Sequence, residues 1–211
     1  MGQKVNPIGF RTGEFYDWKA RWLAPKGEFR NQIIADLKLR RLLFERLKTA
    51  GITDVVIDRL PKSITVHILV TRPGMVIGRG GAGVEELKEF IRKTLALPEN
   101  FKLDVPVEEV TSPELSAHLV AIRIVAELER GLPARRVVTR IAERVMAGGA
   151  LGTKVVLSGR IGGAEIARRQ RFQIGSVPAQ TLRANIDYAQ IPALLKRGYI
   201  GVKVWIHKKE S

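Results

Sequence analysis

A short glycine-rich segment restricts the fold of this 211-residue chain more than any other feature: Gly78-Arg79-Gly80-Gly81. It follows an apolar run, Met75-Val76-Ile77, and precedes a helical pattern whose apolar positions share one face: Val84, Leu87, Ile91 and Leu95. Because glycine has no Cβ, its backbone can approach a phosphodiester closely. The following helix directs its first N–H groups to the same point, which favours an anion. Arg79 can add a charge-assisted hydrogen bond, so the segment predicts a phosphate-binding turn between two helices.

The elements around this turn follow a recognisable order. Before the turn, apolar periodicity predicts a helix at 28–50 and two strands, at 55–57 and 64–70. After the turn and its following helix, it predicts a third strand at 101–107. The order α-β-β-α-α-β with a G-x-x-G turn is typical of a type II KH domain, an RNA-binding fold. We therefore predict such a domain at residues 28–108, with a three-stranded sheet backed by helices. Residues 1–27 would form an N-terminal arm.

The same glycines admit a different interpretation. Gly78, Gly80 and Gly83 also form a G-x-G-x-x-G pattern. Asp104 lies about 20 residues further on, where a dinucleotide-binding fingerprint places its ribose-binding acid. Two observations count against this: Pro73-Gly74 interrupts the apolar run that would have to be the first strand, and no βαβ series follows the turn. An ordinary glycine-rich turn without a ligand is the third alternative. We favour the KH interpretation.

The chain beyond this region predicts a second domain at residues 109–211. Ser112-Pro113 supplies an N-cap and a first helical residue. A second helix is expected over 134–147, where Gly148-Gly149 ends it. Strand patterns follow the helices, near 154–158, 182–188 and 200–207. Helices followed by strands indicate an α+β domain, here with two helices packed on a mainly antiparallel sheet.

The chain carries a large excess of positive charge. Its 36 Lys and Arg residues against 21 Asp and Glu give a formal net charge of +15. Such an excess indicates a polyanionic partner, which binds through counterion release, and nucleic acid is the first candidate. An anionic membrane is the second, but no helix pattern combines apolar anchors with a lysine-rich face, and no segment is apolar enough to span a bilayer. We expect no membrane partner.

Nothing in the sequence indicates an enzyme, a metal site or a cofactor site. The chain has no cysteine, which excludes thiol catalysis and thiolate zinc sites and fits a reducing compartment. The three histidines, His67, His118 and His207, show no ligand spacing, and neither a serine-nucleophile motif nor a Walker loop occurs. We expect no catalytic residue, no metal and no cofactor.

Arginines gather in two segments of the second domain. In its second predicted helix Arg136, Arg140 and Arg144 are spaced four residues apart, and like charges at that spacing destabilise a helix by about a few tenths of a kcal/mol. A bound polyanion would remove this repulsion; an ordinary solvated basic face is the alternative. The second segment, 160–171, places arginines around Gly162-Gly163, which suits a phosphate backbone as well as it suits a hairpin loop.

Five stretches of the sequence resemble the bacterial ribosomal protein S-three family. They are residues 1–11 (MGQKVNPIGFR), 72–78 (RPGMVIG), 156–168 (VLSGRIGGAEIAR), 181–188 (TLRANIDY) and 201–206 (GVKVWI). They occur in the family's order from the first residue almost to the last. Together they are far more specific than the G-x-x-G turn alone.

The resemblance implies a structural, RNA-binding constituent of the small subunit of the cytoplasmic ribosome. It places the protein in the subunit head, on the 3′ major domain of the rRNA, beside ribosomal proteins S-ten and S-fourteen. It also implies that the basic helix contacts incoming mRNA at the entry channel, through Arg135 and Arg136 with Arg140 beside them. All candidate RNA-binding residues are Gly78, Arg79, Gly80, Gly81, Arg135, Arg136, Arg140, Arg144, Arg160, Arg168, Arg169, Arg171 and Arg183.

The sequence departs from the family pattern at several positions in the second domain. Thr139 stands where the family often has a third basic residue of the helix. Ser176 and Gln180 stand where members commonly carry Arg and His. Conversely, Arg169 and Arg171 replace a stretch that is often acidic and aromatic. The resemblance therefore implies that the total basic character is kept while its local distribution differs.

Overall fold

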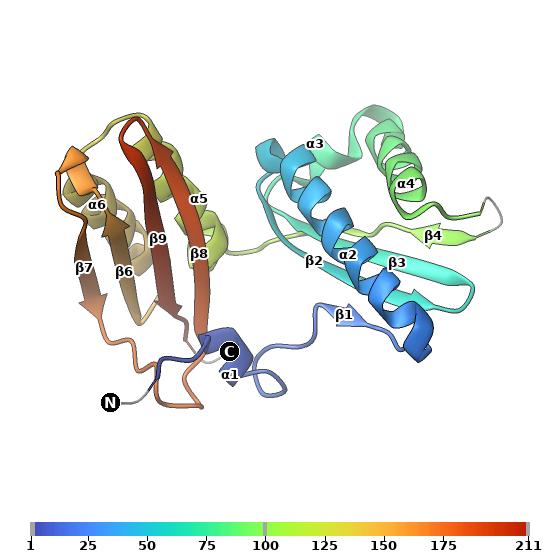
Figure 1. The fold of residues 1–211 in the computed structure, drawn as a ribbon, viewed down its shortest axis with the longest axis horizontal. Helices are drawn as coiled ribbons and strands as arrows, with labels where there is room; N and C mark the ends of the chain where they lie inside the picture. The colour runs from blue at the N-terminus through green and yellow to red at the C-terminus, as the bar shows by residue number, and fades with distance from the viewer. Residues whose placement is uncertain (1–2, 99–100, 210–211) are drawn as a thin grey trace. The chain divides into compact units, whose positions relative to one another are not determined.

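The computed structural model describes residues 3–98 and 101–209, which fold as two compact units. One unit is Trp18–Thr111; the other joins the N-terminal residues up to Asp17 to the chain from Ser112 onward (Figure 1). The predicted arm 1–27 is thus divided between the units. Both units combine helices with a sheet, so the predicted α+β class is confirmed.

The first unit has the predicted order of elements. They are β1 (Ala20–Arg21), α2 (Lys26–Arg46), the 3-10 helix η1 (Lys48–Ala50), β2 (Ile52–Leu60), β3 (Ser63–Val70), α3 (Pro73–Ile77), η2 (Arg79–Gly81), α4 (Ala82–Leu95), β4 (Lys102–Asp104) and β5 (Val107–Glu109). Helices α2 and α4 lie on the same face of the sheet (Figure 1). Alternation along β3 buries every second residue under them, namely Ile64, Val66, Ile68 and Val70.

The sheet of this unit has five strands where the sequence predicted three. Strands β2 and β3 pair antiparallel, and β1 adds to β2 in parallel. The predicted strand 101–107 is broken into β4 and β5, each parallel to β3. Pro106 lies at the break and has no N–H for a ladder. Its carbonyl accepts a hydrogen bond from the Ile68 N–H at 3.0 Å, so the two short strands continue one edge of the sheet.

The second unit packs two helices on a fully antiparallel sheet. Its elements are α1 (Pro7–Phe10), η3 (Pro113–Leu115), α5 (Ala117–Glu129), α6 (Ala134–Ala147), β6 (Gly152–Gly159), η4 (Ile161–Gly163), β7 (Arg168–Gly175), β8 (Ile186–Leu195) and β9 (Gly198–His207). The strand order is β7-β6-β9-β8. Helices α5 and α6 cover one face of the sheet and leave the other face without a helix along most of its length (Figure 1).

Two details of this unit differ from the sequence expectation. The first long helix begins at Ala117, after Ser116, because Ser112-Pro113 opens the separate 3-10 turn η3. No strand was predicted at β7, whose only large apolar residues are Phe172 and Ile174. It is the edge strand of the sheet, where a polar sequence is tolerated.

A buried arginine explains why β8 begins at Ile186 and not near 182 as expected. Arg11 is 0% exposed. Its guanidinium donates to the carbonyl oxygens of Ala184 at 2.6 Å, Thr181 at 2.8 Å and Ala179 at 3.2 Å. These carbonyls point at a side chain, so the segment before β8 cannot enter the ladder. The N-terminal residues are thereby fixed to the second unit.

Candidate nucleic-acid interface

The glycine-rich turn lies between α3 and α4, as the sequence predicted. Gly78, Gly80 and Gly81 have φ angles of 70°, 63° and 86°, which favour glycine. Gly81 is the N-cap position of α4 and no side chain caps this helix end. The first N–H groups of the 14-residue helix therefore remain available to an outside acceptor. Arg79 is exposed beside them.

The four glycines of this segment serve two different purposes. A Cβ at Gly83 would lie 2.4 Å from the Val76 carbonyl oxygen, and a Cβ at Gly78 would lie 3.1 Å from the Gly83 nitrogen. These two allow α3 and α4 to meet. A Cβ at Gly80 or Gly81 would meet nothing within 4 Å. The middle of the turn is thus open to a ligand. The packing role of Gly83 was not predicted from the sequence.

The dinucleotide-binding alternative does not fit this arrangement. Met75 to Ile77 belong to helix α3, so no strand leads into the glycines as that fingerprint requires. Asp104 lies on the short strand β4, with its carboxylate 3.7 Å from the Lys102 ammonium. The KH interpretation therefore remains, because a glycine turn between two helices is the arrangement with which that fold clamps an RNA backbone.

We expect R79D/G80D to weaken binding of single-stranded RNA about tenfold or more, since a hydrogen bond to a charged group is worth about 1.5–3 kcal/mol. Asp tolerates the left-handed conformation better than most residues, and the space around Gly80 is open, so the fold should persist. Fluorescence anisotropy with a labelled oligonucleotide measures the affinity. As a contrast, Gly83→Ala should disturb the α3–α4 contact. Unchanged affinity in R79D/G80D would contradict a clamp at this turn.

Helix α6 has the bounds that the sequence predicted, Ala134–Ala147. One face is buried in the core through Val137, Val138, Ile141, Ala142 and Val145. The predicted arginines are all exposed on the remaining surface: Arg135, Arg136, Arg140 and Arg144. Thr139 is exposed among them. The helix therefore presents four arginines to solvent, with one exposed acidic residue, Glu143, among them.

Only part of this row is balanced by acidic side chains. Arg140 forms an ion pair with Glu127 of α5 at 2.5 Å, so it contributes less to the repulsion than the sequence suggested. Among the described residues, no carboxylate pairs with Arg135, Arg136 or Arg144. Three exposed guanidinium groups thus keep their donors for an outside anion.

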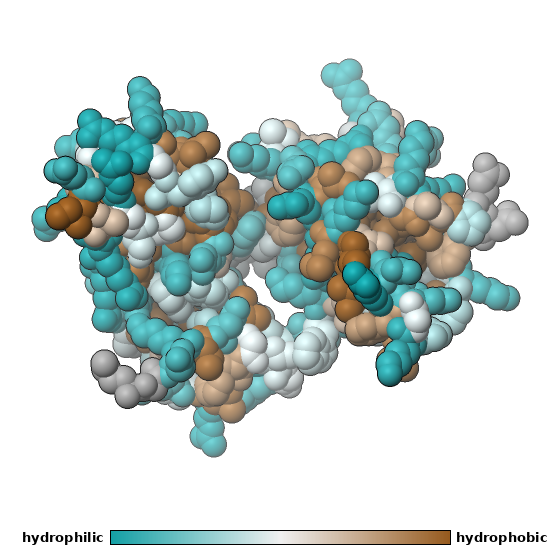
Figure 2. Space-filling view, in the orientation of Figure 1, coloured by the Kyte–Doolittle hydropathy of each residue, from teal (hydrophilic) through white to brown (hydrophobic). Residues whose placement is uncertain are grey.

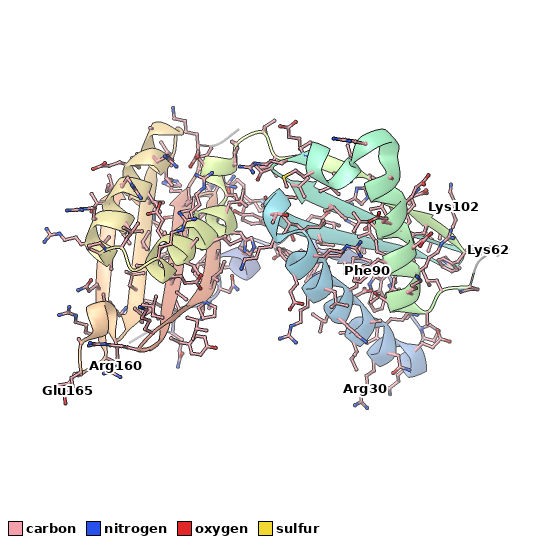
Figure 3. All side chains as sticks on the ribbon, turned by 90° about the horizontal axis from the view of Figure 1, so that it is seen from above. Arg30, Lys62, Phe90, Lys102, Arg160 and Glu165 are labelled. Atoms are coloured by element: carbon pink, nitrogen blue, oxygen red, sulfur yellow. The ribbon has the colours of Figure 1, made fainter. Side chains whose placement is uncertain are left out.

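The second arginine cluster is dispersed by the structure. Arg169 and Arg171 point to the helix-free face of the sheet, whereas Arg168 alternates to the other face. Arg160 lies at the η4 end of the unit, near Glu165 in Figure 3, and donates to the Ala164 carbonyl at 2.9 Å. Exposed Arg183 lies in the connection before β8.

A cleft of about 420 Å³ adjoins Arg160. The turn between α5 and α6, η4 and the β8–β9 turn line it, and Arg130 and Arg197 contribute further cations. The Arg197 guanidinium donates to the Gly163 carbonyl at 2.7 Å, which fixes one wall. Sequence analysis had not included Arg130 or Arg197, because the residues that accompany them come from three separate loops.

Within the part of the chain that the structure describes, no group of three or more His, Asp or Glu side chains is placed to hold a metal ion. In the same residues no helix has the length and apolar character needed to cross a bilayer.

Comparison with known proteins gives two family matches and a set of close relatives. The KH domain model matches residues 38–115, and the model of the ribosomal protein S3 C-terminal domain matches residues 124–206. Small ribosomal subunit protein uS3 of Persephonella marina is 47% identical over the whole chain and 92% of its own length. The uS3 proteins of Caldanaerobacter subterraneus and Coxiella burnetii are 46% and 44% identical, again over the whole chain, with 93% and 91% of their own lengths covered.

Proposed function

This chain belongs to the small ribosomal subunit protein uS3 family, and we propose that it binds the 3′ major domain of the small-subunit rRNA and contacts mRNA at the entry channel. As a member of this family it is a structural component of the cytoplasmic ribosome and not an enzyme. RNA binding and a role in translation follow from the family.

The observation that carries the mRNA contact is the exposed arginine surface of α6. Arg135, Arg136 and Arg144 have no carboxylate partner among the described residues, and the opposite side of the helix is held rigidly in the core. Guanidinium groups on a fixed helix can bind successive phosphates without reading the bases. Such a contact suits a message whose sequence changes continually. The glycine turn offers a second, separate phosphate contact.

The neighbours in the particle belong to the proposal as well. Ribosomal proteins S-ten and S-fourteen are the proposed protein partners, by the family resemblance. We assign the remaining candidates Arg160, Arg168 and Arg183 to rRNA contacts, because they are exposed in loops and on an edge strand and not on α6 itself.

Ribosomes that carry R135A/R136A should retain structured mRNA at least tenfold less well at the entry site, since the loss of even one charge-assisted hydrogen bond costs about 1.5–3 kcal/mol. Translation through a hairpin message should slow, while an unpaired message of the same composition should be spared. Thr139→Lys should act in the opposite direction, because it adds a third cation one turn after Arg135. Timed translation of the two messages on reconstituted ribosomes measures the effect.

A matched variant in the other unit controls for the loss of two charges. R41A/R92A removes two exposed arginines from α2 and α4 and should leave both messages unaffected. Equal slowing on the hairpin and the unpaired message by R135A/R136A, or no slowing on either, would exclude α6 from the entry contact.

A further inference from the structure

The helix-free face of the second sheet carries a regular pattern of cations and aromatic rings. Alternation along the strands sends Val155 and Leu157 into the core beneath the helices, and their neighbours to the opposite face. Three of the rows that cross this face carry the pattern, each in the strand order β7, β6, β9, β8. The rows are Gln173–Lys154–Trp205–Tyr188, Arg171–Val156–Lys203–Gln190 and Arg169–Ser158–Gly201–Pro192.

These rows contain no carboxylate and four cations, namely Lys154, Arg169, Arg171 and Lys203. Opposite residues of neighbouring strands lie about 4.5–5.5 Å apart at their Cβ atoms, and diagonal ones about 7–8 Å. The cations are therefore close neighbours. Val156 is fully buried on this same face. Figure 2 shows a mostly hydrophilic β7 edge of this unit.

Among the described residues, no carboxylate forms an ion pair with Lys154, Arg169, Arg171 or Lys203. Burial lowers the pKa of Lys154, and Arg171, Lys4 and Arg169 lower it further by repulsion. All three of these charged groups are cations, so the N-terminal segment adds to the field and does not neutralise it. An arrangement of this kind is relieved by an anion that spans several positions at once.

Two aromatic rings lie at one end of the rows. Tyr188 and Trp205 are opposite each other in register, with ring centroids 5.1 Å apart and an interplanar angle of 43°. The Lys154 ammonium lies 5.0 Å from the Trp205 ring centroid. The Tyr188 hydroxyl donates to Gln190 at 3.0 Å, which orients the phenol ring on the same face. Aromatic side chains beside a basic path are what unpaired bases stack on.

We propose that this face, defined by Lys154, Arg169, Arg171, Tyr188, Lys203 and Trp205, binds a single-stranded stretch of RNA, with phosphates on the cations and an unpaired base on the aromatic pair. A four-stranded antiparallel sheet whose aromatic side chains stack bases is a known way to bind single-stranded RNA. The inference rests on the proposed function, since the ribosome supplies the RNA, and it assigns a surface and a ligand conformation that the proposed function leaves open.

An acidic protein segment would satisfy the same cations but would not use the aromatic pair as a stacking surface. RNA accounts for both features, because each nucleotide brings one phosphate and one flat base. Stacking on an aromatic ring and contacts with phosphates do not read the identity of a base, so we expect binding without strong sequence preference.

The test compares two variants of the full chain that each lose two lysines. K154Q/K203Q removes two cations of the face, and K38Q/K62Q removes two exposed lysines of the first unit; Lys62 lies at the β2–β3 turn (Figure 3). The probe is a labelled oligouridylate of about 12 nucleotides, within the usual site size of single-strand binders. Its affinity is measured at several salt concentrations.

For K154Q/K203Q we expect at least tenfold weaker binding and a slope of log affinity against log salt that is smaller by about 1.4, because each phosphate contact on a single strand contributes about 0.7. K38Q/K62Q should differ little from the unchanged chain. Equal affinity and slope for the two variants would overturn the proposal.

A cross-linking experiment locates the RNA independently of the substitutions. With 4-thiouridine in the oligonucleotide, we expect light-induced cross-links in peptides that contain Tyr188 or Trp205. Cross-links confined to the glycine turn or to α6, or displacement of the RNA from this face by oligoglutamate at equal concentration, would overturn it. Co-sedimentation with small subunits is measured separately; a chain that fails the cross-linking test and still co-sediments refutes this site and leaves the proposed function intact.

Discussion

Binding of RNA to this chain should weaken about a thousandfold when monovalent salt rises from about 50 to about 200 mM, if roughly six phosphates are contacted. The net charge of +15 and the exposed arginines of α6 and β7 are the physical reason. Phosphate contacts release condensed counterions, and the gain from that release falls as salt rises. Filter binding with a transcript of the 3′ major domain of small-subunit rRNA measures the slope.

The contacts that produce this slope can be separated by substitution. R135A/R136A should reduce the slope by roughly two contacts, or about 1.8 on double-stranded segments. R41A/R92A serves as the control with equal loss of charge. A flat salt profile of the unchanged chain would show that phosphates do not dominate its binding.

Replacing Arg11 with Met should destabilise the second unit by about 3–5 kcal/mol, because three backbone carbonyls lose charge-assisted hydrogen bonds worth about 1.5–3 kcal/mol each, partly offset by no longer burying a charge. Met is similar in length and apolar, so packing is largely kept. The substitution leaves the carbonyls of Ala179, Thr181 and Ala184 without their donor. It also releases the N-terminal residues, since the bond from Arg11 to Ala184 joins positions 173 residues apart.

Hydrogen exchange of the β8 and β9 amides measures the loss of stability in the second unit alone. A global unfolding experiment would not, because a chain of two units need not unfold in a single two-state transition. A loss of about 3 kcal/mol corresponds to exchange more than a hundredfold faster. Lys4→Met, in the same N-terminal stretch but exposed, should change exchange little. Equal exchange in the two variants would show that Arg11 does not hold this unit together.

Elements with a strong period were predictable from the sequence. Helix α6 has the predicted bounds because its apolar residues recur at helical spacing and glycines follow it. Strand β3 alternates over its whole length. The glycine turn was predictable too, since positive φ angles at Gly78, Gly80 and Gly81 are what a run of glycines permits.

Elements that depend on distant contacts were not predictable in the same way. Strand β7 has only two large apolar residues, and its pairing with β6 is what makes it a strand. The start of β8 is set by Arg11, which lies far away in sequence. No local pattern reports on such a contact.

The candidate site was predictable in its residues and less so in their grouping. Arg140 pairs with Glu127, thirteen residues away on another helix. The cross-strand rows place Lys154 and Lys203 beside Arg171, and only the register of three strands shows this. The RNA contacts of the named residues stay predictions, as do the boundaries 28–108 and 109–211 as domains that fold independently.

As a member of the uS3 family, this chain should be an RNA-bound constituent of the small ribosomal subunit. Small subunits assembled without their own uS3 protein can be mixed with this chain and sedimented through a gradient at high salt. We predict that the chain sediments with the particle in equimolar amount and that the particle then binds mRNA at its entry side. A chain that stays at the top of the gradient, at a salt concentration that leaves the other head proteins bound, would contradict the claim.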